Sequence, residues 1–306
     1  MGRQESQSGL LRWKRLEPFG VEVEADLSAP LPPEDAKLFR DLFYSDGLLV
    51  AHHQKLTMEE QIRVMEYIEP VLRSPETIGH ISTDDKKGAL GTQEVLFHSD
   101  IAWLSHPRRA GSLHPLVIKD GASYTDFASG TRAYQKLPEA LKAEIDGLTV
   151  LQMLSRHLEN GKPALGGPVD MELPHCRHPL VKKHPVTGRP IVYVNQLDSK
   201  RIEGTSPERM MSLGAELFEQ LYAPDNIFKH HWYMGDLVIW DNLALQHARG
   251  NCEDVGERTL QRVAIGDKTM AEMDSRLDVK KNPKVFEFLS KSYGKDHEKV
   301  TIKDLA

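Results

Sequence analysis

A histidine and an aspartate stand two positions apart in the stretch FHSDIAWL (97–104), which is otherwise mostly apolar. Side chains at i and i+2 of a strand point to the same face, so His98 and Asp100 would lie side by side if the stretch is a strand. Burying an unpaired imidazole and carboxylate costs on the order of several kcal/mol. We therefore expect either that this face is solvated or that something is bound to the two side chains.

A third candidate ligand, His247, lies far along the chain in LVIWDNLALQHARG (237–250), where an apolar strand runs into a turn before the histidine. Two histidines and one carboxylate are the ligand set of non-haem Fe(II) oxygenases. Three ligands on one face of the ion leave the opposite positions open, and iron needs them to bind a chelating co-substrate and dioxygen together. The pattern therefore predicts an Fe(II) site at His98, Asp100 and His247.

Other histidines in the chain are alternative candidates for metal ligands. His230 and His231 are adjacent, so in a strand they face opposite ways and at most one of them could enter the same site. His178 and His184 flank prolines and a turn-like VTGR, and we expect both to be structural or solvated. Zinc also binds two histidines and an aspartate, so a zinc-dependent hydrolase stays open, as does a non-catalytic metal-binding protein.

Two arginines follow His247 in ERTLQRVAIGD (257–267), four residues apart. In a strand they share a face, and two guanidinium groups held side by side repel each other unless an anion is present. Arg258 and Arg262 are suited to bidentate binding of a carboxylate. Surface salt bridges are the commoner fate of an arginine pair, but the position after His247 favours an anion site.

The elements that must position these side chains are mostly short strands. Strand-like runs recur at 97–104, 112–118, 148–154, 191–194, 236–240 and 259–265. Because few helices intervene, the pattern favours an antiparallel sandwich or jelly roll over a doubly wound parallel sheet. Helices are expected outside the strands at 32–43, from Thr57, at 131–145 and from Ser206. The polar segment 80–94 is expected to be a mobile loop.

Composition limits the broad class. The chain has 306 residues, of which 40% are hydrophobic and 27% charged, as in ordinary soluble globular proteins. A net charge of -6 argues against a general nucleic-acid binder. Two cysteines, Cys176 and Cys252, are too few for a disulfide framework and suit a reducing cytoplasm. No stretch is typical of a membrane span or secretory signal, and the match of Gly2 and Ser6 to a myristoylation pattern is best explained by chance.

Several motifs in order resemble the taurine and 2,4-dichlorophenoxyacetate dioxygenases, which depend on Fe(II) and 2-oxoglutarate. The resemblance covers roughly residues 17–268 and rests on LEPFGVEVEADLS, FHSD, YTDFASG, HPLVKKHPVTGRPIVYVNQ, GDLVIWDNLALQH and RTLQRVAIGD. It implies a mainly β fold with flanking helices, namely a double-stranded β-helix or cupin-like jelly roll. We expect a single domain over 1–306, with its core at about 17–268 and a C-terminal extension of unknown role at 269–306.

The resemblance also implies roles for individual residues. The two histidines and the aspartate singled out above match the iron ligands. Thr125 and Arg258 fall where the family holds the distal carboxylate of 2-oxoglutarate. Arg262 matches an arginine near the anionic group of the prime substrate, and Trp240 stands where an aromatic residue lies near the iron, although a core role for Trp240 is equally expected.

The reaction expected from this resemblance is hydroxylation of a small carboxylate, sulfonate, sulfate or phosphonate by dioxygen, with release of succinate and carbon dioxide. Cleavage follows if the hydroxylated carbon bears a heteroatom. The intact Asp100 argues against halogenation. Taurine is not favoured, because EYIEPVLRSPET (66–77) lacks the histidine of taurine-oxidising members and Phe97 replaces a common tryptophan. We expect a cytoplasmic homo-oligomer that binds neither nucleic acid nor membranes.

Overall fold

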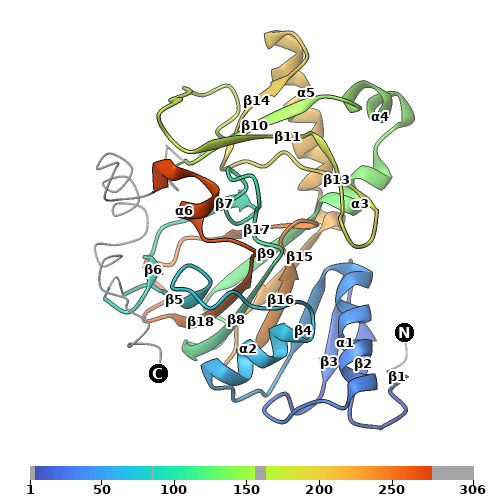
Figure 1. Ribbon diagram of the computed structural model, residues 1–306, viewed down its shortest axis with the longest axis vertical. Helices are drawn as coiled ribbons and strands as arrows, with labels where there is room; N and C mark the ends of the chain where they lie inside the picture. The colour runs from blue at the N-terminus through green and yellow to red at the C-terminus, as the bar shows by residue number, and fades with distance from the viewer. Residues whose placement is uncertain (1–3, 85, 156–162, 278–306) are drawn as a thin grey trace.

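The computed structural model describes residues 4–84, 86–155 and 163–277, and strands dominate its centre (Figure 1). The largest sheet has nine strands in the order β1-β2-β3-β4-β16-β8-β18-β5-β6. Its neighbours are antiparallel except for the β3–β4 and β5–β6 pairs. The strands are β1 (Gln4–Glu5), β2 (Arg12–Arg15), β3 (Val21–Glu24), β4 (Leu48–Ala51), β5 (Ile78–Ser82), β6 (Ala89–Leu90), β8 (Ala110–Val117), β16 (Leu237–Asp241) and β18 (Thr259–Ile265).

A second sheet of four antiparallel strands packs against the first in the order β15-β9-β17-β7. Its strands are β7 (Val95–His98), β9 (Tyr124–Ser129), β15 (Ile227–His231) and β17 (Leu245–Arg249). Phe127 and Leu245 of this sheet share a buried cluster with Val238 and Leu260 of the nine-stranded sheet. Side chains two residues apart on a strand share a face. Residues two or four positions from one of these four, on the same strand, therefore also point between the sheets.

Two helices cover the other face of the nine-stranded sheet. The apolar sides of α1 (Pro33–Asp46) and α2 (Met58–Glu66) are buried in one cluster with residues of β3, β4, β16 and β18. The predicted capping box starts α2: the Thr57 side chain accepts the Glu60 N–H, and the Glu60 carboxylate accepts the Thr57 N–H. The sandwich is therefore shielded from solvent on this side.

Most of the remaining elements form a smaller layer, whose β10, β11, β14, α4 and α5 are seen at the top of Figure 1. Its strands are β10 (Thr149–Met153), β11 (His175–Pro179) and β14 (Ser199–Glu203), which pair antiparallel, and the pair β12 (Val181–Lys183) and β13 (Pro190–Val192). Its helices are α3 (Gly130–Lys136), α4 (Glu139–Ile145), α5 (Pro207–Leu221) and the short 3-10 helix η1 (Pro224–Asn226). Buried side chains such as Leu213 and Leu217 of α5 join these elements in one core.

The start of the expected C-terminal extension belongs to the packed structure. After β18 come α6 (Met270–Met273) and the 3-10 helix η2 (Ser275–Leu277). Leu277 is buried in a cluster with Trp103 and Leu154. The first part of the extension therefore packs against the segment that follows Asp100, and residues 278–306 lie outside the described residues.

Three predicted elements differ from the observed ones. The stretch 97–104 is not one strand, because β7 ends at His98 and Asp100 lies in the turn beyond it. The helix expected at 131–145 is divided into α3 and α4, since the residue before Pro138 is extended, as prolines require of their predecessor. The segment 80–94, expected to be a loop, contains the end of β5 and all of β6.

The predicted class, mainly β with flanking helices, is confirmed. Within the described ranges, no helix has both the length and the apolar character needed to cross a membrane. Cys176 and Cys252 are both free thiols, the first partly exposed and the second buried.

Candidate metal centre

Three side chains converge where β7 and β17 lie side by side. The two strands pair with His98 opposite His247, and the centroids of their imidazole rings are 4.2 Å apart. Asp100 Oδ1 lies 3.5 Å from His98 Nε2 and 3.6 Å from His247 Nε2. Two atoms that each bind one ion at about 2.0–2.2 Å are separated by at most about 4.4 Å. The donor atoms are therefore placed to share a metal ion.

The position of Asp100 is set by the turn that joins β16 to β17. The Asp100 N–H donates to Asn242 Oδ1 at 2.7 Å, and its carbonyl oxygen accepts from Asn242 Nδ2 at 3.2 Å. The same Nδ2 also donates to the carbonyl oxygen of Arg108 at 2.8 Å. Sequence reasoning missed Asn242, because it precedes His247 by five residues but acts on a residue 142 positions away.

The protonation states of the three side chains suit metal binding. His98 Nδ1 lies 2.8 Å from the Leu96 carbonyl oxygen, which only accepts, so Nδ1 carries a proton and Nε2 presents its lone pair. Burial lowers the pKa of His247 to about 3, so this imidazole is neutral at pH 7. Burial opposes ionisation of Asp100, but its contact with His98 and the charge of Arg262 keep its pKa below the usual value.

Trp240 forms an apolar wall beside the metal centre. Its ring lies 4.9 Å from that of His247 and 5.8 Å from that of Phe127, between centroids. Both Trp240 and Phe127 are buried. A Cβ at Gly111 would come within 2.4 Å of the Trp240 ring, so glycine is needed there for the ring to fit. Trp240 is thus a core residue that also contacts a candidate ligand.

Arg258 and Thr125 both lie against the side chain of Trp232. Arg258 is only 1% exposed; its Nε donates to Ser123 Oγ at 3.1 Å, while its buried Nη1 has no partner within the described ranges. The Arg258 guanidinium lies 5.9 Å from the Trp232 ring centre, and Trp232 Nε1 donates to Thr125 Oγ1 at 2.9 Å. The Thr125 hydroxyl therefore keeps its own hydrogen for another acceptor. Burial, together with the charge of Arg249, lowers the pKa of Arg258 to about 10.

Arg249 is a second buried arginine in this region, and sequence reasoning missed it. It lies two residues after His247 on β17, opposite Thr125 on β9, so it points between the sheets. Its Nη2 donates to the carbonyl oxygens of Leu90 and Gln93, whereas its buried Nε and Nη1 lack partners among the residues described. The sequence did offer a signal for Arg249: it stands two residues after the predicted ligand His247, so in a strand both side chains share a face. Two buried guanidinium groups with unpaired N–H groups are suited to an anion.

Arg262 lies on β18, whereas its predicted partner Arg258 directly precedes that strand, and the two side chains have separate contacts. Its Nη1 is 3.8 Å from Asp100 Oδ2, and its Nη2 donates to the Glu76 carbonyl oxygen at 2.7 Å. Neither arginine is a surface salt-bridge residue. The structure thus directs Arg258 toward Ser123 and Arg262 toward the metal centre.

The competing histidines do not join this cluster. Three of them are buried and have polar partners: His178 with the Ala102 carbonyl at 2.9 Å, His184 with Asp241 at 2.8 Å, and His230 with Asp236 at 3.0 Å. His231 is exposed. The structural role expected for His178 and His184 is therefore confirmed.

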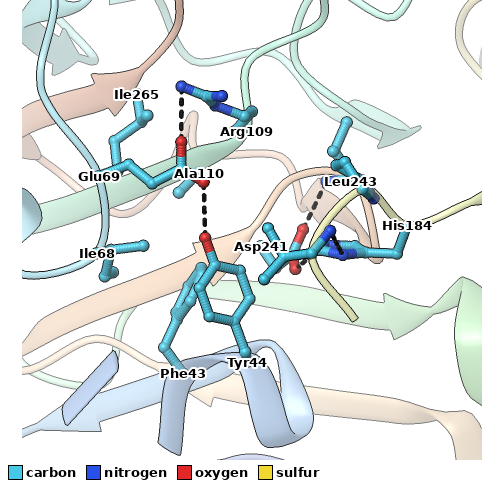
Figure 2. A pocket seen from close by; sticks show the side chains of 12 residues that line it. Phe43, Tyr44, Ile68, Glu69, Arg109, Ala110, His184, Asp241, Leu243 and Ile265 are labelled. Atoms are coloured by element: carbon cyan, nitrogen blue, oxygen red, sulfur yellow. Dashed lines mark hydrogen bonds and ion pairs between the residues drawn. The ribbon is translucent and has the colours of Figure 1, made fainter. Parts of the chain in front are cut away.

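A hollow near the end of β16 is closed by polar side chains (Figure 2). The Tyr44 hydroxyl donates to Glu69 at 2.7 Å, Arg109 pairs with Glu69 at 2.6 Å, and His184 faces Asp241. Asp241 also accepts two backbone N–H groups of the turn that leads to β17. With a volume of about 10 Å³, the hollow has room for about one water molecule and is too small for a substrate. The side chains around it stabilise this turn.

Two histidines and one carboxylate beside buried arginines, placed between two mainly antiparallel sheets, are the side chains that a non-haem iron centre with an anionic co-substrate would need. Comparison with known families agrees. The model of the family described as taurine catabolism dioxygenase TauD, TfdA family, matches residues 12–264, so the chain belongs to this family.

Curated relatives and solved structures support the same class. The chain is 27% identical over 267 residues to the alpha-ketoglutarate-dependent 2,4-dichlorophenoxyacetate dioxygenase of Cupriavidus pinatubonensis, covering 78% of this chain and 90% of the relative. It is 28% identical over 262 residues to an alkylsulfatase of Acinetobacter baylyi, covering 81% and 82%. A crystal structure of AAD-2 in complex with Mn(II) and N-oxalylglycine matches with a TM-score of 0.71 and 25% identity, covering 85% and 98%. The protein is therefore an Fe(II)- and 2-oxoglutarate-dependent dioxygenase.

Proposed function

We propose that this enzyme hydroxylates a small organic anion at an iron ion held by His98, Asp100 and His247. The proposal rests above all on the convergence of the two Nε2 atoms on one Asp100 oxygen, at 3.5 and 3.6 Å. When bound, iron and 2-oxoglutarate supply the oxidising chemistry, with release of succinate and carbon dioxide. If the hydroxylated carbon bears a heteroatom, the product collapses and that bond is cleaved.

The basic region between the sheets is the proposed site for the distal carboxylate of 2-oxoglutarate. Arg258 would donate from its unpaired Nη1, and Thr125 from its free hydroxyl hydrogen. Arg249 adds a second guanidinium with two unpaired N–H groups. Hydrogen bonds between charged partners are roughly twice as strong as neutral ones, and more so where water is excluded. These residues would therefore orient the co-substrate toward the metal centre.

The prime substrate is proposed to be an anion because Arg262 places a positive charge beside Asp100. Two relatives are named for 2,4-dichlorophenoxyacetate and for alkyl sulfates, both of which are anionic compounds. A carboxylate, sulfonate, sulfate ester or phosphonate would each suit this charge. Trp240 would limit the space on the His247 side and keep water from that part of the site.

We also infer that the two facing sheets form a double-stranded β-helix, or jelly roll, in a single domain whose core is about 17–268. The mainly antiparallel pairing within both sheets and their shared core support this topology. A homo-oligomer is proposed for the assembled enzyme. Light scattering that gives the mass of one 34.6 kDa chain would refute that part of the proposal.

The activity is tested by a screen for succinate release. Purified protein is reconstituted with Fe(II) under argon, then mixed with 2-oxoglutarate, air-saturated buffer and a panel of small carboxylates, sulfonates, sulfate esters and phosphonates. The expected result is succinate formed in equal amount to an oxidised product, and only with one class of anion. The His98→Ala protein is the matched control and should release none.

Two results would contradict the proposal. Turnover that continues without oxygen or 2-oxoglutarate would indicate a zinc-type hydrolase on the same ligand set. Failure to bind Mn(II) and 2-oxoglutarate, measured by calorimetry under argon, would indicate that the three donors and the arginines do not form the proposed site.

A further inference from the structure

A second guanidinium group, that of Arg108, lies close to Arg262. Arg108 Nη2 donates to the Glu76 carbonyl oxygen at 3.5 Å, and Arg262 Nη2 donates to the same oxygen at 2.7 Å. Burial, and next the charge of Arg262, hold the pKa of Arg108 below its usual value, although Glu76 and Asp100 oppose this shift. Two like charges therefore lie side by side near the metal centre.

The fold fixes the position of the Arg108 charge. Asn242 Nδ2 donates to the carbonyl oxygens of Arg108 and Asp100, at 2.8 and 3.2 Å, which ties the Arg108 backbone to that of a candidate metal ligand. At the other end of the side chain, Arg108 Nη1 donates to the Lys268 carbonyl oxygen at 3.1 Å. A Cβ at Gly266 would come within 2.5 Å of this Nη1, so the guanidinium is closely packed.

The carboxylate of Glu76 partly offsets these two charges. Its Oε2 lies 3.3 Å from Arg108 Nη2 and accepts the Met270 N–H at 2.6 Å. Asp100 is the carboxylate that faces Arg262, at 3.8 Å, and a bound metal ion would share its charge. With the metal in place, the two guanidinium groups would therefore face the single full charge of Glu76. One positive charge is left for a substrate.

The two arginines differ in their access to solvent. The side chains of Arg262 and Asp100 are 21% and 22% exposed, whereas that of Arg108 is 2% exposed. An anion from solvent can thus contact Arg262, while Arg108 and its partner Glu76 act on that anion through their charges.

We propose that Glu76 is a specificity-determining residue: by offsetting the charge of Arg108, it makes the subsite at Arg262 prefer an anion with one negative charge to an anion with two. This inference rests on the proposed function, and it narrows the substrate to carboxylates, sulfonates and sulfate esters. A doubly charged anion would keep one charge without a partner, which is costly in a partly buried position. If the Glu76 charge were absent, both guanidinium groups would be available to such an anion.

The experiment compares matched ligands on the protein loaded with Mn(II) and 2-oxoglutarate under argon. The probes are ethyl, butyl and phenyl sulfate, each against the phosphate ester of the same group. At about pH 8 the sulfate esters carry one charge and the phosphate esters two, because the second pKa of a phosphate ester is about 6. Calorimetry gives the dissociation constants. At least one sulfate ester is expected to bind about tenfold or more tightly than its phosphate partner.

The Glu76→Gln protein is expected to bind phosphate esters about tenfold more tightly relative to sulfate esters than the unaltered protein does, because a removed charge affects a dianion twice as strongly as a monoanion. Glutamine keeps the shape of the side chain and an oxygen for the Met270 N–H. Glu69, paired with Arg109 at 2.6 Å and similarly exposed, supplies the matched control. The Glu69→Gln protein should keep the original ratio.

A change in this ratio separates the proposed role from a merely structural one. Weaker folding, or weak binding of phosphate esters to Mn(II) itself, affects both proteins alike and leaves the change in ratio at zero. The Arg262→Gln protein should lose affinity for the sulfate esters, which checks that the probes bind at this subsite.

Four outcomes would overturn the inference: no sulfate ester binds, the unaltered protein does not prefer sulfate to phosphate esters, the Glu76→Gln and Glu69→Gln proteins have the same ratio, or the Arg262→Gln protein keeps its affinity for sulfate esters. If the unaltered protein still binds Mn(II) and 2-oxoglutarate, only this inference fails. If it binds neither, the proposed function fails as well.

Discussion

Two clusters in this protein each consist of two histidines and one aspartate, but the side chains are arranged differently in the two. At the metal centre, the nearest imidazole nitrogens stay 3.5 and 3.6 Å from Asp100 Oδ1. In the second cluster, Asp236 Oδ1 lies 2.6 Å from His52 Nδ1, and Asp236 Oδ2 lies 3.0 Å from His230 Nε2. One set of donors faces a common point, whereas the other is closed by hydrogen bonds.

The difference shows that residue types alone do not make a ligand site. Asp236 also accepts the Tyr233 N–H at 2.8 Å, so both of its oxygens have donors. Around the metal centre, by contrast, His247 Nδ1, Trp240 Nε1 and Arg258 Nη1 are buried without partners among the described residues. Buried polar groups normally have partners, so a concentration of unpaired ones indicates where ligands bind.

The largest expected effect separates the two clusters by metal binding. The His98→Ala protein should lose activity by about 10³-fold or more, because a first ligand of the metal is removed. Its Mn(II) affinity, measured by electron paramagnetic resonance of the free ion, should fall with it. The His230→Ala protein removes an equally buried, aspartate-bonded histidine and should keep Mn(II) affinity. Equal losses in both would mean that the comparison is mistaken.

A second effect concerns the unpaired guanidinium. The Arg258→Gln protein should bind 2-oxoglutarate about 10- to 100-fold more weakly, because a hydrogen bond between charged groups contributes about 1.5–3 kcal/mol. Mn(II) affinity should stay unchanged, since Arg258 contacts none of the three metal-binding side chains. Calorimetry under argon gives both constants. The partly exposed Arg209, paired with Glu144 and Glu216, supplies the control R209Q, which should bind 2-oxoglutarate normally.

The closed cluster should instead respond to acid. Burial opposes ionisation of Asp236, but its bonds to His230 and His52 lower its pKa to about 2. Because an unfolded aspartate titrates near pH 3.9, this pairing stabilises the fold by about 2–3 kcal/mol above about pH 4, and the contribution is lost as pH falls toward about 2. The Asp236→Asn protein should be less stable at pH 7 by this amount, and its urea midpoint should change less between pH 4 and 2. A parallel pH dependence in both proteins would contradict this assignment.

The smallest effect tests how Asp100 is positioned. The Asn242→Ala protein should bind Mn(II) about tenfold more weakly, as removal of residues that orient metal ligands costs about 10–100-fold. Asn226 is a matched control, because it is also buried and its Nδ2 donates to two carbonyl oxygens, those of Ser129 and Leu221. The Asn226→Ala protein should lose stability but keep Mn(II) affinity. An unchanged affinity in the Asn242→Ala protein would show that the turn alone holds Asp100.

The strands and helices were predictable where local patterns are strong. The capping box at Thr57 and the apolar runs of β16 and β18 are visible from neighbouring residues alone. The strand with His98 was predicted too long, because DIAWL is apolar enough to continue it although Ile101 adopts a positive φ of 52° in the turn. The break at Pro138 was missed because an apolar stripe continues through it.

The sequence by itself determined which residue types could bind iron and a carboxylate, since the histidines, the aspartate and the arginines stand in ordered motifs along the chain. Only the tertiary structure decided which buried polar atoms pair with each other and which have no partner among the described residues, and so brought Asn242 and Arg249 into the account. The physical reason is that pairing of buried groups depends on contacts between residues far apart in the chain, as between Asn242 and Asp100, which are 142 positions apart. Such contacts follow from how the sheets pack, which no local pattern encodes.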